Sequence, residues 1–529
     1  MPAQLSWLLA LGLAASPPPP PSPGLVDDGL PFRSESLALS DALREGTQHN
    51  LDLAAVALDV EINEAKVLAA LGAYDVMLTA NLTANIAETP QRGSQFAFAL
   101  GQRSIGGGVG FRRALETGGS IALTFDTRRT RLDQPLDPTN PNGGRAALSA
   151  FAVVPSLTLT QPILRGAGFK VNRAPIDKAK IATNAAEAAK LATAQELARD
   201  LIAAYWELSF AHRDLANRRR SVESVRQQLD RTEKMVRAGK RSRIEAKAVE
   251  QALASREAEV GKAENAVLEA SLALRKRMGQ KLVGLDALGI QPTTVPEVQP
   301  RAVLIDDEVE RALAANPRIK QIELQISGLR IDQRVAANAR LPKLDASASF
   351  TPQGRSIESL GNPAAGVPPR EASWGQAFRN MFNSDVGNNG LLADWTLSGS
   401  ITLTWDVQSR GARGARQQAK LAVEQATLQL EQTRQEVVAD VILAANRLRT
   451  AGKTIAAAQT SEELARENLA AEQAKFELGR ATNYDVLLRQ DQLDAASTAT
   501  VRAQVDYLVA LADLQANNGE ILPAYGLAR

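Results

Sequence analysis

The sequence predicts a mainly α-helical protein with a β-barrel part, and three observations lead to that prediction. Two stretches of the 529-residue chain, Ala174 to Gly279 and Gly414 to Gly519, are rich in helix-forming residues and contain no proline after Pro175. Short segments outside them alternate apolar and polar side chains with period two, as strands do. Both patterns occur twice, so the chain is a tandem duplication.

The two long stretches carry the same coiled-coil seam. Apolar or small residues recur at steps of four and three, and adding 240 to each number of the first seam gives the second. The first seam is Leu197, Leu201, Ala204, Leu208, Ala211 and Leu215, and the second is Val437, Val441, Ala444, Leu448, Ala451 and Ile455. Beyond each seam the chain is expected to turn back at a glycine, Gly239 or Gly479. Each stretch is therefore predicted to form an antiparallel helical hairpin.

Each copy also begins with a pair of short helices. They are predicted at residues 37–49, 51–73, 306–315 and 318–340. Asn50 and Asn316 each stand just before a helix and are expected to act as N-caps. At 1.5 Å per residue the outgoing arm of the first hairpin is about 95 Å long and the returning arm about 60 Å. The helix at 51–73 is expected to stack end to end on the returning arm, which gives a hollow tube of uniform height.

Four strands per chain are predicted from the alternation of period two. They lie at residues 78–86, 157–160, 344–350 and 401–407. Residues 121–125 alternate as well, and whether they extend a strand or fold outside the sheet stays open. The segments between paired strands are rich in Gly, Pro and Asn and are expected to be long loops. These loops are 89–119 with 140–144, and 352–394; the last contains one amphipathic turn formed by Trp374, Phe378, Met381 and Phe382.

Four strands cannot close a barrel, and an open sheet edge is not tolerated in lipid. Strands of about ten residues with one apolar face suit a tilted crossing of a bilayer. Three copies of a four-stranded chain would give twelve strands. A small soluble sheet packed on helices is the alternative that the pattern alone leaves open.

The organisation along the chain follows from these elements. Leu5 to Ala15 is an apolar run of signal-peptide length, and Pro17 to Pro23 is a stiff tether. The expected divisions are 1–24, signal peptide and Pro-rich tether; 25–290, first repeat; 291–300, linker; 301–522, second repeat; and 523–529, C-terminal tail.

Composition excludes several classes of function. The 61 basic and 59 acidic residues leave a net charge of +2, which argues against a nucleic-acid surface. The chain has no cysteine, and His49 and His212 have no ligand spacing around them. We therefore expect no enzyme activity, no cofactor and no metal site.

Four segments resemble the TolC-type outer-membrane efflux proteins. The most specific is FELGRATNYDVLLRQDQLDAA (476–496), with a weaker counterpart VRAGKRSRIEAKAVEQALAS (236–255), and TQPILRGAG (160–168) and DWTLSGSITLTW (394–405) are also similar. The resemblance implies a homotrimer with a twelve-stranded barrel in the outer membrane and a periplasmic α-helical tunnel. It also implies an exit duct of a tripartite efflux or type I secretion system for small molecules, metals or proteins. The implied partners are a periplasmic adaptor protein and an inner-membrane pump.

The resemblance further implies a periplasmic gate made of acidic rings. Asp485 stands six residues after Gly479, and Glu245 stands six residues after Gly239. Leu488 occupies the place of a second acidic residue of the family, and Ala481 that of its tip arginine, so the network that closes the gate is in question. A simpler alternative for both acids is a carboxylate stabilised by a helix N-terminus.

The hairpin tips are the expected docking surface for the adaptor. The residues proposed for it are Gly239, Lys240, Arg241, Gly479 and Arg480. The glycines permit the reversal of the chain, and the basic residues crowd the turn with positive charge. A rival of another class is a soluble or periplasmic coiled-coil scaffold that oligomerises through its helices.

Overall fold

The computed structural model describes residues 25–26, 29–88, 101–137, 140–284, 287–298, 302–361, 366, 368–382 and 394–527. The expected signal peptide and tether, residues 1–24, lie outside this part. The chain divides into two compact units. The helical unit is Met1–Val56, Lys190–Pro317 and Arg434–Arg529, and the sheet unit is Ala57–Ala189 and Arg318–Thr433.

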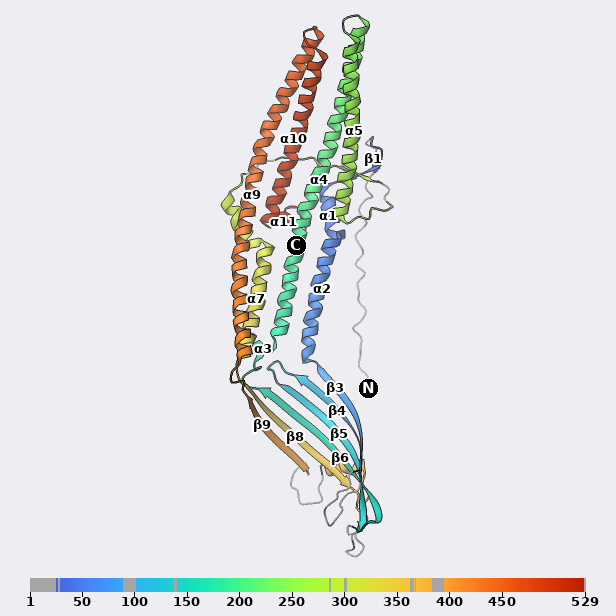
Figure 1. Ribbon diagram of the computed structural model, residues 1–529, viewed down its shortest axis with the longest axis vertical. Coiled ribbons are helices and arrows are strands. Elements are labelled where there is room, and N and C mark those ends of the chain that lie inside the picture. Colours follow the sequence, from blue (N-terminus) through green and yellow to red (C-terminus); the bar gives the residue numbers. More distant parts are fainter. Residues whose placement is uncertain are drawn as a thin grey trace, which may run out of the picture. The chain divides into compact units, whose positions relative to one another are not determined.

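The predicted helical hairpins are confirmed. Each has a long outgoing and a shorter returning helix: α4 (Ala174–Arg237) with α5 (Arg243–Met278), and α9 (Arg410–Glu477) with α10 (Asn483–Asn517) (Figure 1). Leu201, Leu208 and Val441 of the predicted seams are completely buried. The hairpins thus pack through the coiled-coil face that the sequence predicts.

The four short helices also agree with prediction to within two residues at each end. They are α1 (Leu39–His49), α2 (Leu51–Leu71), α6 (Ile305–Ala315) and α7 (Pro317–Asn338). A further turn of helix, α11 (Ile521–Ala524), follows the second hairpin.

Equivalent contacts in the helical unit show the tandem duplication. The side-chain amide of Asn50 donates to the carbonyl of Arg277 (2.8 Å), and that of Asn316 donates to the carbonyl of Asn517 (3.3 Å). The two acceptors differ by 517 − 277 = 240 residues, the spacing of the seams. A Cβ atom added to Gly279, at the end of α5, would collide with the last carbonyl of α1. The end of α5 therefore abuts the start of α2, as the expected stacking requires.

A small three-stranded sheet in the helical unit was not predicted. Its strands are β1 (Leu25–Val26), β2 (Ser34–Leu37) and β7 (Gly289–Pro292), in the order β1-β2-β7. The buried guanidinium of Arg275 on α5 pairs with Glu35 of β2 (2.7 Å) and donates to the carbonyl of Gly289 (3.1 Å). Strands this short carry no visible periodicity, which is why the sequence did not reveal them.

The sheet unit is built on one antiparallel sheet of six strands, in the order β3-β4-β5-β6-β8-β9 (Figure 1). The strands are β3 (Val76–Ala87), β4 (Gly101–Ala114), β5 (Ser120–Asp137), β6 (Asn140–Pro162), β8 (Lys343–Ile357) and β9 (Asp394–Thr404). Two short helical turns, η1 (Gly72–Tyr74) and α3 (Phe169–Asn172), connect the sheet to α2 and α4.

The prediction of four strands is therefore wrong in number, although the mainly helical fold with a barrel-type sheet is confirmed. Strand β4 lies in the expected loop 89–119, and β6 begins inside the expected loop 140–144. The alternating residues 121–125, left open above, belong to β5. At the other edge, β9 ends at Thr404, before the expected 407.

Strand β4 escaped prediction because of its glycines. Gly106, Gly107, Gly108 and Gly110 interrupt its alternation and are the residues that usually indicate a loop. In the sheet they make room for neighbouring side chains. A Cβ atom at Gly108 would collide with the carboxylate of Asp126 on β5 and would lie 2.7 Å from Oδ1 of Asn81 on β3.

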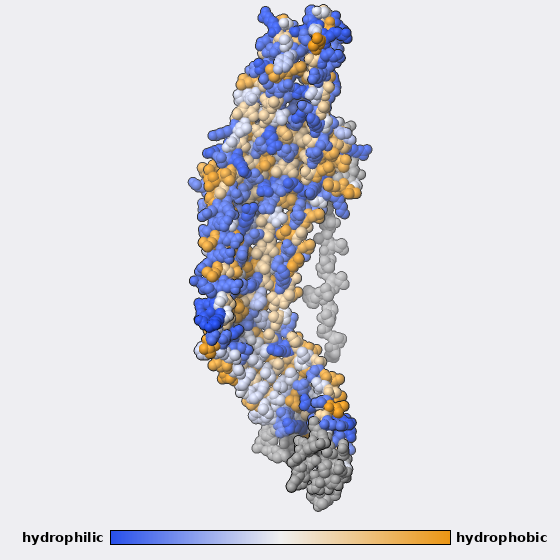
Figure 2. All heavy atoms as spheres, in the orientation of Figure 1, coloured by the Kyte–Doolittle hydropathy of each residue, from blue (hydrophilic) through white to orange (hydrophobic). Residues whose placement is uncertain are grey.

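The six strands share two chemically different faces. One row of paired residues across the whole sheet is apolar: Leu78, Phe111, Leu123, Leu157, Phe350 and Leu397. The adjacent row, on the opposite face, contains only glycine and hydroxyl side chains: Thr79, Gly110, Thr124, Ser156, Thr351 and Thr396. Figure 2 shows a pale face of the sheet, the colour of residues in the middle of the hydropathy scale.

The predicted amphipathic turn is present as α8 (Trp374–Asn380), and it packs on the apolar face of the sheet. Ala377 is completely buried beside Phe151 and Val153 of β6, and the rings of Phe151 and Trp374 meet edge to face at 5.0 Å. Gly354 of β8 lies so close to α8 that a Cβ atom there would collide with the helix backbone.

Within the described ranges no helix has both the length and the apolar character needed to cross a bilayer.

Candidate functional site at the hairpin tips

Both hairpins turn back through the same backbone motif, all of it in the helical unit. At the first tip Gly239 has φ +71°, and the amide of Lys240 donates to the carbonyl of Met235 (2.9 Å). At the second tip Gly479 has φ +74°, and the amide of Arg480 donates to the carbonyl of Lys475 (2.8 Å). Lys475 follows Met235 by 240 residues, so the two bonds are equivalent in the two copies. This is the Schellman arrangement, which favours glycine at the position of positive φ. The expected reversals at these two glycines are confirmed.

The helices that return from the tips begin differently. At the first tip the Ser242 side chain accepts one hydrogen bond, from the amide of Ile244 (3.3 Å). At the second, Thr482 and Asp485 form a reciprocal capping box. The hydroxyl and the amide of Thr482 donate to the Asp485 carboxylate at 2.6 and 2.9 Å. These bonds lower the pKa of Asp485 below its usual value, the bond from the hydroxyl most of all.

Arg241 connects the two tips. Its guanidinium donates to the carbonyl of Ala481 on the second tip (2.9 Å) and lies over the Phe476 ring, 5.0 Å from the centroid. It also pairs with Glu245 on its own tip at 3.5 Å. Ala481 is the position where the resemblance implies an arginine. In this chain the arginine comes from the opposite hairpin and reaches the backbone at that position.

Asn483, in the first turn of α10, makes further hydrogen bonds between the two hairpins. Its buried side-chain oxygen accepts from Gln228 (2.7 Å) and from Thr232 (2.9 Å), both on α4. Its amide nitrogen donates to Glu245 (3.2 Å). Glu245 is thus half-buried between the hairpins and bound by both tips, whereas the Asp485 carboxylate is bonded by Thr482 of its own tip.

An open cleft of about 760 Å³ lies between the tips. Four cationic side chains line it together with one carboxylate: Arg231, Lys234, Lys240, Arg241 and Glu477. The ends of the hairpins are mainly hydrophilic in Figure 2. The cleft is therefore a positively charged surface, suited to an acidic or carbonyl-rich partner segment.

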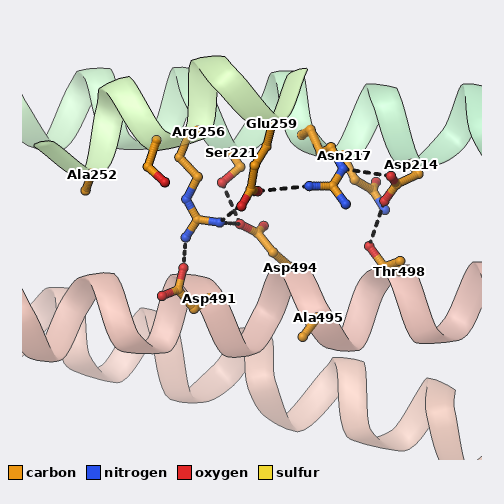
Figure 3. Close-up of a pocket in the computed structure, with 12 residues that line it drawn as sticks. Asp214, Asn217, Ser221, Ala252, Arg256, Glu259, Asp491, Asp494, Ala495 and Thr498 are labelled. Atoms are coloured by element: carbon orange, nitrogen blue, oxygen red, sulfur yellow. Dashed lines mark hydrogen bonds and ion pairs between the residues drawn. The ribbon is translucent and has the colours of Figure 1, made fainter. Parts of the chain in front are cut away.

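Further from the turns, a polar cluster holds α10 against the first hairpin (Figure 3). It consists of Asp214, Arg218, Ser221, Arg256, Glu259, Asp491, Asp494 and Thr498. Arg256 of α5 pairs with Asp491 and Asp494 of α10, and Ser221 of α4 donates to Asp494 (2.5 Å). These bonds place charged side chains from three helices in one partly open cavity of about 550 Å³.

The cluster contains more carboxylates than cations. Burial raises the pKa of Asp494, and the bond from Ser221 and the charge of Arg256 oppose that shift. The hydrogen bond to Asp214 raises the pKa of Arg218. Because burial raises the pKa of Asp494, the packed hairpins bind a proton at this carboxyl more readily than separated helices would, so this group favours the contact more as the pH falls through its raised pKa.

The sequence-predicted site residues fall into two groups. The structure brings Arg241 and Glu245 together with the second tip, and it leaves Asp485 in a capping box, the simpler alternative stated above. Sequence reasoning missed Asn483 and the polar cluster. Their signal was a set of polar residues, such as Arg256 of α5, on helix faces that otherwise pack. Only the packing of the helices shows which of these residues meet.

No metal site emerges from the geometry. Within the described ranges no group of His, Asp and Glu side chains is arranged to hold an ion. His212 is bonded to the carbonyl of Ile290 (2.8 Å), an ordinary structural contact.

Comparison with protein families gives one match. The model of a family described as "Outer membrane efflux protein" matches residues 120–280 and 309–520. The matched ranges cover more than half of the chain and include both hairpins and their tips. Among curated proteins none matches the chain.

The fold is also found in solved outer-membrane channels. OprN is 15% identical, with 91% of this chain and 90% of that chain covered and a TM-score of 0.62. CmeC of Campylobacter jejuni is 14% identical over 91% and 85%, with a TM-score of 0.60. MtrE of Neisseria gonorrhoeae, solved in its open state, is 17% identical over 92% and 89%, with a TM-score of 0.60. At these identities the likeness shows the fold.

Proposed function

This chain belongs to the outer membrane efflux protein family, and from that premise we propose that three copies form an exit duct from the periplasm to the outside. Membership places the chain in the outer membrane, with its helical domain in the periplasm. The duct would serve a tripartite efflux or type I secretion system, and its cargo would be small molecules, metals or proteins.

The two-faced sheet is the observation that supports a membrane duct most strongly. One face exposes large apolar side chains, with exposed fractions of 62% for Leu78 and 65% for Leu397. The other face presents hydroxyl groups and glycine, which suit a water-filled lumen. In the described part of the chain β3 and β9 are each paired on one side only. Because unpaired backbone is costly in lipid, several copies must join their sheets edge to edge.

A matched pair of variants tests this assignment. Ile401 and Ser400 are neighbours inside β9, on the apolar and the polar face. Arginine at Ile401 should destabilise the inserted trimer by up to about 2–4 kcal/mol, the cost of a charge near the midplane of the bilayer, whereas arginine at Ser400 should cost much less. Outer-membrane fractionation, with the trimer assayed by native mass spectrometry, measures both. A water-soluble monomer with full β content would favour the coiled-coil scaffold and contradict the proposal.

We propose that a periplasmic adaptor docks at the tips, and that the adaptor in turn connects the duct to an inner-membrane pump. The positively charged cleft between the tips supports this, since a charged surface steers a partner of opposite sign. A photo-crosslinking residue placed at Lys240 should capture the adaptor in cells, and the same residue at exposed Lys262, far along α5, should not. Equal capture at both positions would contradict docking at the tips.

The gate is proposed at the same tips. Three Asp485 carboxylates around one axis would form an acidic ring, and the capping box keeps each of them ionised. Glu245 would contribute less to the ring than the sequence suggested, because Arg241 and Asn483 already neutralise and bind it. The contact between Arg241 and Ala481 would hold the tips closed in place of the arginine that the family carries at that position.

A further inference from the structure

We propose that the barrel of this duct has eighteen strands, six from each of three copies, in place of the twelve implied by the family resemblance. The two additional strands are β4 and β5, and they would lie inside the membrane wall. The inference rests on the proposed trimer. It changes the width of the channel at the outer membrane.

The first support is the position of β4 and β5 in the sheet. They lie between β3 and β6, with continuous antiparallel pairing on both sides: β3 pairs β4 from Val76 to Ala87, and β4 pairs β5 from Gly101 to Ala114. Strand β5 pairs β6 from Ser120 as far as Pro135 without a register shift. A hairpin that merely extended outside a four-stranded sheet would leave β3 and β6 paired with each other.

The second support is the continuity of both faces across the added strands. Phe111 and Leu123 fill the middle of the apolar row that begins at Leu78 and continues to Leu157. Their exposed fractions are each 48%, as expected of side chains on the lipid-facing side of a single chain. The alternation of β4 and β5 is therefore in phase with that of the strands on either side, and a register slip of one residue would reverse it.

The third support is the glycine row of β4 on the polar face. Gly108 and Gly110 lie under side chains from both neighbouring strands, and Gly106 lies under the Thr83 side chain of β3 and the backbone of β5. At Gly110 a Cβ atom would lie 2.8 Å from Oγ1 of Thr79 on β3 and 3.4 Å from a methyl group of Thr124 on β5. Glycine is thus the residue that suits β4 when it lies between these two strands, in agreement with the backbone pairing.

The direction of the strands permits closure. All five pairings are antiparallel, so β3 and β9, the first and last of six, run in opposite directions. Strand β9 of one copy can therefore pair with β3 of the next copy in the antiparallel sense that barrels of this class use. Threefold repetition closes the sheet at eighteen strands.

The consequence is a wider lumen. With strands about 4.8 Å apart and tilted by about 40°, eighteen strands give a backbone diameter of about 36 Å, against about 24 Å for twelve. Barrels of sixteen to eighteen strands enclose an aqueous channel. The barrel would then admit bulkier cargo than a twelve-stranded wall.

Cysteine cross-linking tests the strand order, and the natural chain contains no cysteine to interfere. Thr79, Thr124 and Ser156 stand in one row of the polar face, on β3, β5 and β6. The double variant Thr124→Cys, Ser156→Cys joins adjacent strands and should form a disulfide within one protomer. In Thr79→Cys, Ser156→Cys the two cysteines are three strand spacings apart, about 14 Å, which a disulfide cannot bridge.

The experiment uses the full-length trimer in outer membranes. Efficient oxidation of Thr79→Cys, Ser156→Cys, or of Thr79→Cys with Val154→Cys or Thr158→Cys, would show β3 beside β6 and overturn the inference. The proposed trimer would survive that result, because native mass spectrometry reports it separately. A nitroxide at Phe111→Cys should be reached by oxygen dissolved in lipid, whereas one at Thr124→Cys should be reached by a water-soluble nickel reagent. Water exposure of both labels would also overturn the inference.

Discussion

The two hairpin tips share a turn but differ in what they contribute to the contact between them. Both reverse through a glycine of positive φ, with equivalent backbone bonds 240 residues apart. The first tip supplies the charged side chains, Arg241 and Glu245, and the second supplies the groups that receive them, the carbonyl of Ala481 and the ring of Phe476. The two tips share a duplicated backbone, but their side chains at equivalent positions differ. This difference makes the surfaces of the two tips complementary to each other.

The largest expected effect comes from the buried amide on the receiving tip. Asn483→Ala removes the acceptor for Gln228 and Thr232 and a donor to Glu245. Buried groups left without partners cost about 1–3 kcal/mol each. Thr232 can still donate to the carbonyl of Gln228 (2.8 Å), so the main penalty falls on Gln228 and Glu245, and we expect a loss of about 2–3 kcal/mol in the contact between the tips. Thermal unfolding of the detergent-solubilised trimer measures the loss. The equivalent position on the first tip is exposed Arg243, and Arg243→Ala should leave the melting temperature nearly unchanged.

The charged partner on the first tip should have the next largest effect. Arg241→Ala removes a hydrogen bond, an ion pair and a ring contact, and hydrogen bonds to charged groups are worth about 1.5–3 kcal/mol. We expect tips that open more readily, seen as higher single-channel conductance and greater sensitivity of cells to large antibiotics. Arg480→Ala, which removes a neighbouring exposed charge, is the control. Equal conductance in the two variants would show that Arg241 does not hold the tips together.

These two residues mark the limit of what the sequence could show. The heptads, the repeat and the two turn glycines are local patterns, and the structure confirms them. The partner of Arg241 could not be found in this way, because Ala481 contributes only a backbone carbonyl and such a group has no signature in the sequence. Asn483 was missed for a related reason: it follows the helix cap, where asparagine is ordinary, and only packing against α4 buries it.

The strands of the sheet show the same limit of prediction from sequence. Strands β3, β8 and β9 were found because each contains a run of residues that alternates between apolar and polar side chains. In β4 the polar half of the alternation is made of glycine, since side chains from β3 and β5 occupy that space. A strand whose own residues are small because its neighbours are large cannot be recognised until those neighbours are known.

The turn itself should respond equally at both tips. Gly239→Val and Gly479→Val place a β-branched residue at positive φ, which costs about 1–2 kcal/mol even though nothing else obstructs the added atoms. We expect both variants to lose export while the trimer remains in the membrane. Gly452→Ala, in the interior of α9 and in ordinary contact with Tyr507, is the matched control and should be neutral or slightly stabilising. Normal export by either valine variant would show that its tip has no part in docking.

The smallest effect concerns the reciprocal capping box, which of the two tips only the second has. The bonds from Thr482 lower the pKa of Asp485, so this carboxylate stays ionised as the pH falls below the ordinary aspartate value of 3.8. The stabilisation by the cap is therefore present at neutral pH and is lost only when the pH falls through that lowered pKa. If Asp485 lines the gate, block of the channel by divalent cations should persist to lower pH than an ordinary aspartate allows. Thr482→Val should move the loss of block to higher pH, and Asp485→Asn should weaken block at every pH. Single-channel recording at a series of pH values measures this block. Equal block in wild type and Asp485→Asn would show that Asp485 does not line the gate. Block that is unaffected by Thr482→Val would show that the cap does not control the charge of Asp485.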